Sequence, residues 1–279
     1  MYRFLLRPRW ILSHLFVTVV VLAMLTAGFW QLRRLDERRA TNEKILSVTT
    51  DAPVPIDTLV TPTTPKSDLS ALQYRPVSVT GTYRADEQVL INNRTNNGAP
   101  GYWVVTPLVQ ANGVAVAVNR GWVPFSVSVD GPWDEFAPPT GTVTVTGIIR
   151  LTQERSSGIV SGPADAATGE LRLLSRVDVQ RLAQQIDEKL LPVYINLTGT
   201  SVPVAPYPIA VPPPDLSEGP HLGYALQWFA FSLLTIIVYP LLLRRVAKRR
   251  QASLHDDDDN DGDDAVDGDE IEFVSTKES

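Results

Sequence analysis

The sequence predicts a membrane protein in which two transmembrane α-helices flank a mainly antiparallel β domain of the α+β class. Residues 11–30 and 222–243 form runs of twenty and twenty-two residues without a formal charge. Each run is long enough to cross a hydrocarbon core of about 30 Å as a helix. Between them, polar and apolar residues alternate with period two, which is typical of half-buried strands.

These observations divide the chain into five segments. We expect a cytoplasmic N-terminus at 1–10, a first transmembrane helix at 11–32, an extracytoplasmic β-rich domain at 33–221, a second transmembrane helix at 222–243, and a cytoplasmic basic flank with a disordered acidic tail at 244–279. The first apolar run exceeds the core of a signal peptide, and no A-x-A site follows it, so a retained anchor is favoured. The polar residues at 33–44 indicate that this helix continues as a short stalk.

Basic residues predict the orientation. Arg244, Arg245, Lys248, Arg249 and Arg250 follow the second span directly, and such clusters stay in the cytoplasm. The first span has basic residues on both sides, so the second span decides. Because two spans place both termini on one side, we expect a multi-pass protein of the bacterial plasma membrane with both termini in the cytoplasm.

The β domain is expected to form a small curled sheet or barrel with one or two helices. Gly and Asn clusters at 96–101 and 112–113 indicate hairpin turns. An amphipathic helix is predicted at 177–190, with Leu182 and Ile186 on one face and Pro192 beyond its end. The strands are predicted at 75–83, 88–93, 102–109, 114–119, 142–149 and 193–197.

Composition argues against an enzyme. The chain has no cysteine, and its histidines are His14, His221 and His255, none of them inside the strand-forming region. A Ser-His-Asp arrangement or a zinc site built on His or Cys is therefore excluded there. The methionines are Met1 and Met24, so soft copper ligation is excluded as well.

The negative net charge belongs to the C-terminal tail. Residues 251–279 have twelve acidic side chains and one lysine, whereas the other 250 residues have 24 basic and 19 acidic groups. Asp257, Asp259, Asp261 and Gly262 fit the first half of a calcium loop, but its twelfth position is Gly268 instead of a glutamate. A solvated, disordered tail is the favoured interpretation.

A candidate site lies at the head of the second span. On a helix, His221, Tyr224 and Trp228 share one face, with Gln227 beside them. One interpretation is an interfacial belt, because such side chains are common at headgroup depth. The other makes His221 an axial haem ligand flanked by aromatic rings. His14 is nearly a bilayer away, so both histidines cannot hold one iron within a protomer.

Five segments, taken in order, resemble the Surfeit locus protein 1 family of cytochrome c oxidase assembly factors, of the bacterial, actinobacterial type. The resemblance covers residues 10–245 and includes the two-span layout. The tail departs from the family pattern. The segments are GFWQLRRLDER at 28–38, RPVSVTG at 75–81, PGYWVVTP at 100–107, VNRGWVP at 118–124 and HLGYALQWFAF at 221–231.

The resemblance implies a non-enzymatic factor that helps haem a reach the catalytic subunit of a haem–copper oxidase. His221 matches the family's implicated haem ligand, so the expected haem a site consists of His221, Tyr224 and Trp228, with His221 on the iron. Trp30 and Gln31 share the outer boundary of the membrane with His221 and either complete one pocket or act as anchors. Gly121 is expected to supply a special backbone angle, and Trp122 to pack in the core.

Two further functions remain open. The chain could be a scaffolding subunit that docks on the oxidase or a respiratory supercomplex without binding haem. It could also be an unrelated envelope protein, such as a sensor, with an anchored β domain. In each case the partners are the bilayer and other proteins, and no nucleic acid is expected.

Overall fold

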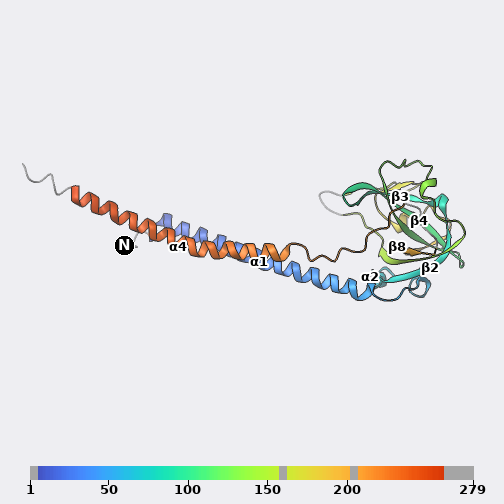
Figure 1. Ribbon diagram of the computed structural model, residues 1–279, viewed down its shortest axis with the longest axis horizontal. Helices are drawn as coiled ribbons and strands as arrows, with labels where there is room; N and C mark the ends of the chain where they lie inside the picture. The colour runs from blue at the N-terminus through green and yellow to red at the C-terminus, as the bar shows by residue number, and fades with distance from the viewer. Residues whose placement is uncertain (1–5, 157–161, 202–206, 261–279) are drawn as a thin grey trace, which may run out of the picture. The chain divides into compact units, whose positions relative to one another are not determined.

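The computed structural model describes residues 6–156, 162–201 and 207–260. The chain divides into two compact units: one contains the residues up to Ala40 and those from Ser217 onward, and the other contains residues 41–216. Two long helices occupy the ends of the chain, α1 at Pro8–Thr49 and α4 at His221–Asn260 (Figure 1). A mixed β-sheet domain lies between them in the sequence.

Both helices extend beyond the predicted spans. Helix α1 continues through the basic residues at 33–44, so the expected stalk is helical. Helix α4 continues through the basic flank to Asn260 and therefore reaches the start of the acidic segment, where we expected disorder. Most of the candidate calcium loop, Asp261 to Gly268, lies outside the described residues.

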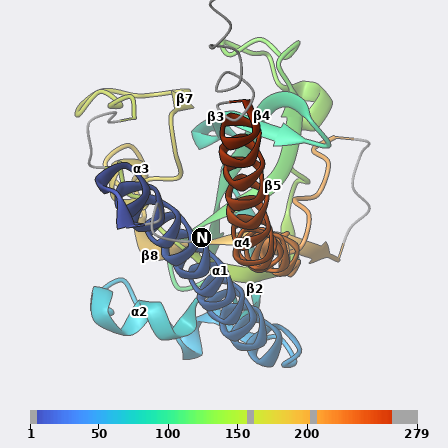
Figure 2. The same ribbon diagram turned by 90° about the vertical axis from the view of Figure 1, so that its left-hand side faces the viewer.

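Six strands make up most of the β domain, and each contains most or all of one strand predicted from the alternation. Three short 3₁₀ turns lie at Ile56–Thr58, Ala85–Glu87 and Asp134–Phe136. Helix α2 spans Lys66–Leu72 and lies outside the strands (Figure 2). The strands are β2 (Pro76–Tyr83), β3 (Val89–Asn96), β4 (Ala99–Gln110), β5 (Val114–Pro124), β6 (Thr142–Leu151) and β8 (Lys189–Thr200), with the two-residue β1 (Val54–Pro55) and β7 (Leu173–Leu174).

Five of these strands close into a ring. They follow the order β2–β6–β8–β5–β4, and an antiparallel pairing of Gly81 with Gln110 joins β4 back to β2. The sheet is mixed: β1–β2, β3–β7 and β5–β8 are parallel, and the other pairs are antiparallel. The expectation of a mainly antiparallel sheet therefore missed its parallel part, because pairing direction leaves no trace in a period-two pattern.

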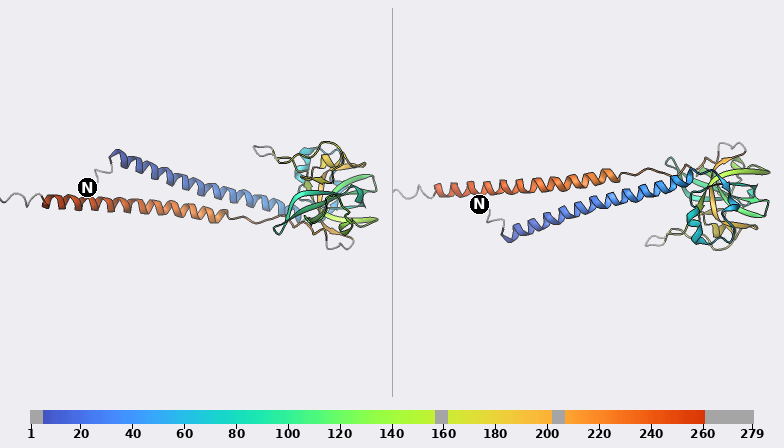
Figure 3. Two further views of the ribbon diagram at one scale, coloured as in Figure 1. Left: turned by 90° about the horizontal axis from the view of Figure 1, so that it is seen from above. Right: turned by 90° about the horizontal axis from the view of Figure 1, so that it is seen from below.

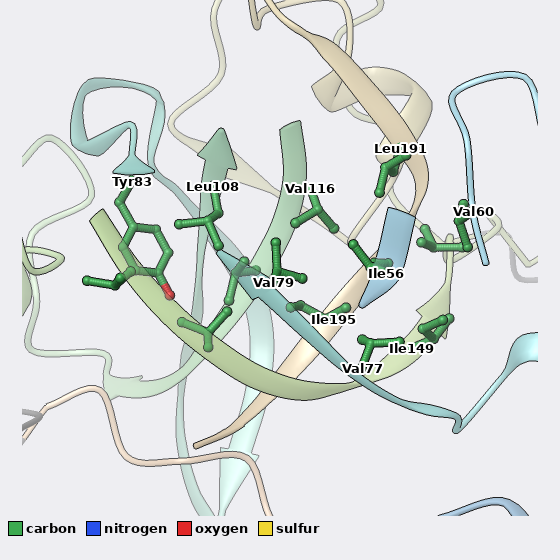
Figure 4. Close-up of a cluster of buried hydrophobic side chains, with 14 of the residues drawn as sticks. Ile56, Val60, Val77, Val79, Tyr83, Leu108, Val116, Ile149, Leu191 and Ile195 are labelled. Carbon is green, nitrogen blue, oxygen red and sulfur yellow. The ribbon is translucent and has the colours of Figure 1, made fainter. Parts of the chain in front are cut away.

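The core fills both faces of β5. Val116 and Val118 pack inside the ring with Val77 and Val79 of β2, as the close-up shows for Val77, Val79 and Val116 (Figure 4). Ala115 and Ala117 face a second cluster, which includes Tyr194 and Leu182. A strand buried on both faces has a nearly continuous apolar sequence, as 114–118 does.

The helix predicted at 177–190 is wrong beyond its first turns. Helix α3 covers only Val179–Leu182, and β8 begins at Lys189 and includes Pro192. Leu182 and Ile186 are both buried, as the helical pattern required, but Leu190 and Leu191 enter the sheet. Pro192 is tolerated there because it lies at a bulge in the β5–β8 ladder, where its missing N–H breaks no regular pairing.

A second bulge lies in β5 at Arg120. Gly121 pairs with Val104 and Asn119 with Val105, so Arg120 is the extra residue of the ladder. Gly121 adopts a φ of 142°, which agrees with the special angle expected from the sequence, although it lies within the strand. Trp122 is buried, as expected, and its Nε1 donates to the Arg94 carbonyl oxygen over 3.1 Å.

Tyr83 makes the stability of the β domain depend on pH in the alkaline range. Burial raises the pKa of its phenol to about 12 despite the opposing charge of Arg120, whose guanidinium lies 5.5 Å from the ring. The folded pKa exceeds the unfolded value near 10, so this contribution to stability is complete below pH 10 and is lost between pH 10 and 12.

We expect wild type to lose about 2–3 kcal/mol of unfolding free energy relative to Tyr83→Phe across that pH window. Chemical unfolding of the detergent-solubilised protein at several alkaline pH values measures the difference. Parallel pH profiles for the two proteins would contradict this assignment.

Candidate functional site

Helices α1 and α4 pack along one seam. Between His14 and Leu35 of α1, the buried residues are Gly28 and Leu35, seven apart, and Ala225 and Ser232 of α4 are buried with the same spacing. Gly28 allows the closest approach, because a Cβ there would lie 2.6 Å from the Phe229 ring. The N-terminal end of α1 and the C-terminal end of α4 lie at the same end of the pair (Figure 3). The helices are therefore antiparallel, and both are long and apolar enough to cross a membrane.

His221, the first residue of α4, contacts α1 directly. Its Nδ1 lies 2.9 Å from the side-chain oxygen Oε1 of Gln31. A carbonyl oxygen can only accept, so a neutral imidazole that donates in this contact has its proton on Nδ1 and its lone pair on Nε2. The structure thus brings together two residues that the sequence placed at one membrane boundary.

The segment before His221 is tied to α1 as well. Arg39 forms a bidentate ion pair with Glu218, with Nε–Oε1 and Nη2–Oε2 distances of 2.8 Å. Arg38 donates from Nε to the Ser217 carbonyl oxygen over 3.1 Å. The hydrogen bond from Arg39 lowers the pKa of Glu218, so the pair persists to acidic pH. No local pattern in the sequence indicates this clamp, because it joins residues far apart in the chain.

Tyr224 and Trp228 have a different environment from His221. They are 49% and 37% exposed, and Trp228 packs edge-to-face against Phe231. The predicted trio therefore consists of one anchored imidazole and two open aromatic side chains, which fits both a belt and the wall of a ligand site. Of the two α1 residues expected at this boundary, Gln31 is hydrogen-bonded to His221, whereas the Trp30 side chain is largely exposed.

The opposite end of the helix pair has a similar polar contact. His14 Nδ1 lies 2.6 Å from the hydroxyl of Tyr239, which also lies 3.0 Å from Ser13 Oγ. Seventeen residues separate Gln31 from His14, and eighteen separate His221 from Tyr239. At about 1.5 Å per residue the two contacts are about 26 Å apart, so the histidines cannot share one metal ion.

The side chains at this site could supply one axial nitrogen, that of His221, to a haem iron. Among residues 6–156, 162–201 and 207–260, no three His, Asp or Glu side chains converge as a metal site. Gly219 has a φ of 71°, and a Cβ on it would lie 3.6 Å from His221 Nε2. Because Gly219 has no side chain, it places no Cβ against the ring edge that bears Nε2.

Two apolar helices that bracket one β domain, with a histidine at the head of the second helix, define a class of helix-anchored β proteins. Within it, the profile of the SURF1 family matches residues 18–233, and the chain belongs to this family. SURF1-like proteins of Mycobacterium tuberculosis and Mycobacterium bovis are each 30% identical over 244 residues, covering 84% of this chain and 83% of theirs. Surfeit locus protein 1 of Xenopus tropicalis is 23% identical, covering 82% of this chain and 75% of its own.

Proposed function

We propose that this protein is a membrane-anchored, non-enzymatic assembly factor for a haem–copper cytochrome c oxidase. In this proposal α1 and α4 span the bacterial plasma membrane, both termini are cytoplasmic, and the β domain is extracytoplasmic. Membership of the SURF1 family, the lengths of the two apolar helices and the basic flank after residue 243 support it.

Its partner is the catalytic subunit of the oxidase, alone or within a respiratory supercomplex, and its cargo is haem a. His221 is the proposed axial ligand, and Tyr224 and Trp228 offer apolar ring faces beside it. The contact between His221 Nδ1 and Gln31 Oε1 is the observation on which the ligand assignment rests, because it leaves Nε2 available for iron. When bound, haem a would supply an iron centre that can take such a nitrogen as its axial ligand.

The test compares the absorption spectra of wild type, His221→Ala and His14→Ala, each purified from membranes that make haem a. His14 is a matched control, because it is also a helix residue bonded through Nδ1 to the other helix. We expect His221→Ala to bind haem at least about tenfold more weakly, since losing the ligand should cost no less than losing one of its outer partners, and His14→Ala to bind haem as wild type does.

The second candidate is a scaffolding subunit that docks beside the oxidase without holding haem. The exposed aromatic side chains at the head of α4 favour it, since such residues also serve as membrane anchors. This candidate predicts stable co-purification with oxidase subunits and normal oxidase assembly in His221→Ala. Equal haem in wild type and His221→Ala would remove the ligand assignment, and a wild-type protein without haem would favour scaffolding.

A further inference from the structure

We propose that Gln31 is the positioning residue of His221. Its side-chain oxygen holds the proton on Nδ1 and thereby directs the Nε2 lone pair toward the ligand. The part of this inference that concerns haem rests on the proposed function. The part that concerns the protonated nitrogen of His221 applies to the haem-free protein as well. It assigns a role to a neutral amide near the end of the uncharged part of α1.

The chemistry of the contact relates the amide oxygen to the proton on the ring. A neutral imidazole has one donor nitrogen and one acceptor nitrogen, and a hydrogen-bond partner on one nitrogen decides which is which. The 2.9 Å contact places Gln31 Oε1 on Nδ1. If Gln31 instead presented its NH₂ group, Nδ1 would accept, the proton would move to Nε2, and the lone pair would be turned away from any ligand.

The backbone next to His221 is held in place by further contacts. Arg39 and Arg38 hold Glu218 and Ser217 against α1, only three and four residues before His221. Gly219 then turns the chain with a positive φ, and Pro220 accepts a hydrogen bond from Tyr224 N over 3.1 Å as α4 begins. With so short a connection, the start of α4 has little freedom to slide along α1.

The position of Gln31 along the predicted span also favours the contact. Gln31 is the penultimate residue of the predicted first span, and it is flanked in the sequence by Trp30 and Leu32. A polar side chain at the edge of the bilayer is costly unless it is bonded, and the histidine meets this need. Each side chain therefore stabilises the other, and the pair fixes the rotation of the α4 head as well as the proton.

The first experiment uses the haem-free protein in detergent, with ring-¹⁵N-labelled histidine. The His221 resonances are assigned by difference from His221→Ala. We expect the Nδ1–H tautomer in wild type and a mixture of both tautomers in Gln31→Leu. A wild-type protein with the proton on Nε2 of His221 would overturn the inference whether or not haem is ever bound.

The second experiment measures haem retention and midpoint potential for Gln31→Leu, Gln31→Glu and the control Gln227→Leu, prepared from the same membranes. Gln227 is an exposed glutamine of α4, so it matches the change in chemistry. We expect Gln31→Leu to retain haem about tenfold more weakly than wild type, as loss of an outer partner of a ligand histidine does. Gln227→Leu should behave as wild type.

Gln31→Glu separates positioning from mere structural support. A carboxylate accepts the Nδ1 proton more strongly, increases the basicity of Nε2 and favours ferric over ferrous haem. A tenfold change in that preference lowers the midpoint potential by about 59 mV. A shift in this direction supports the inference. An unchanged midpoint potential in Gln31→Glu, or equal haem retention in Gln31→Leu and Gln227→Leu, would contradict the role of Gln31 and leave His221 as the ligand. A wild-type protein without haem would instead contradict the proposed function.

Discussion

Gly121→Ala is expected to destabilise the β domain by about 3–5 kcal/mol. Two separate costs add up at this position. A residue with a Cβ is strained at the observed φ of 142°, and the new Cβ would lie 2.3 Å from the carbonyl oxygen of Ile209. That oxygen cannot retreat easily, because it accepts the backbone N–H of Trp122 over 2.7 Å.

The matched control is Gly113→Ala. Gly113 also has a positive φ, 76°, but no heavy atom lies within 4 Å of the position its Cβ would take. The control therefore has the backbone strain without the clash, and we expect it to cost only about 1–2 kcal/mol. Chemical unfolding of both variants in detergent measures the difference. Equal losses would show that the contact with Ile209 is unimportant.

The long helices and the six main strands could be predicted because each has a continuous pattern in the sequence. Uncharged runs are long at 11–30 and 222–243, and apolar residues alternate along 75–83 and 142–149. The short strands β1 and β7 have two residues each, too few for any period. The error at 177–190 has a similar origin, because buried Leu182 and Ile186 satisfy the helical spacing in a turn as well as in a helix.

The candidate site was predictable as a set of residues but not as a set of contacts. His221 and Gln31 were both expected at the outer boundary, yet only the rotation of each helix decides whether their side chains meet. Once that contact is known, antiparallel packing and equal spacing along the helices lead to the pairing of His14 with Tyr239. The Arg39–Glu218 clamp joins residues far apart in the chain, and no local pattern indicates it.

The second large effect on stability is expected at Arg120, because of the environment of its side chain. It is buried at the β5 bulge and donates to Gln88 Oε1 and to the carbonyl oxygens of Phe136 and Ala137, over 2.8–3.1 Å. Burial lowers the pKa of its guanidinium to about 10, so the side chain remains charged at neutral pH. These acceptors offset the cost of burying the charge and attach the 3₁₀ turn at Asp134–Phe136 to the ring of strands.

Arg120→Met is therefore expected to cost about 3–5 kcal/mol. Gln88 keeps a donor in Thr106, whose hydroxyl lies 2.8 Å away, but the two backbone carbonyls lose the bonds from Arg120 and cannot be replaced by mutation. Arg120→Lys should also destabilise, since one ammonium lacks the forked donors. The exposed ion-pair variant Lys66→Ala, in the same domain, should cost no more than about 1 kcal/mol.

Arg120→Met also tests whether the two units have separate roles. The contacts described for His221 come from residues 31–39 and 217–224, all within the unit that contains most of α1 and α4. Arg120→Met should thus lower the yield of folded protein and expose the 125–141 region to protease, while haem bound per folded molecule stays at the wild-type value. Loss of haem from the folded fraction would show that the β domain itself contributes to ligand binding.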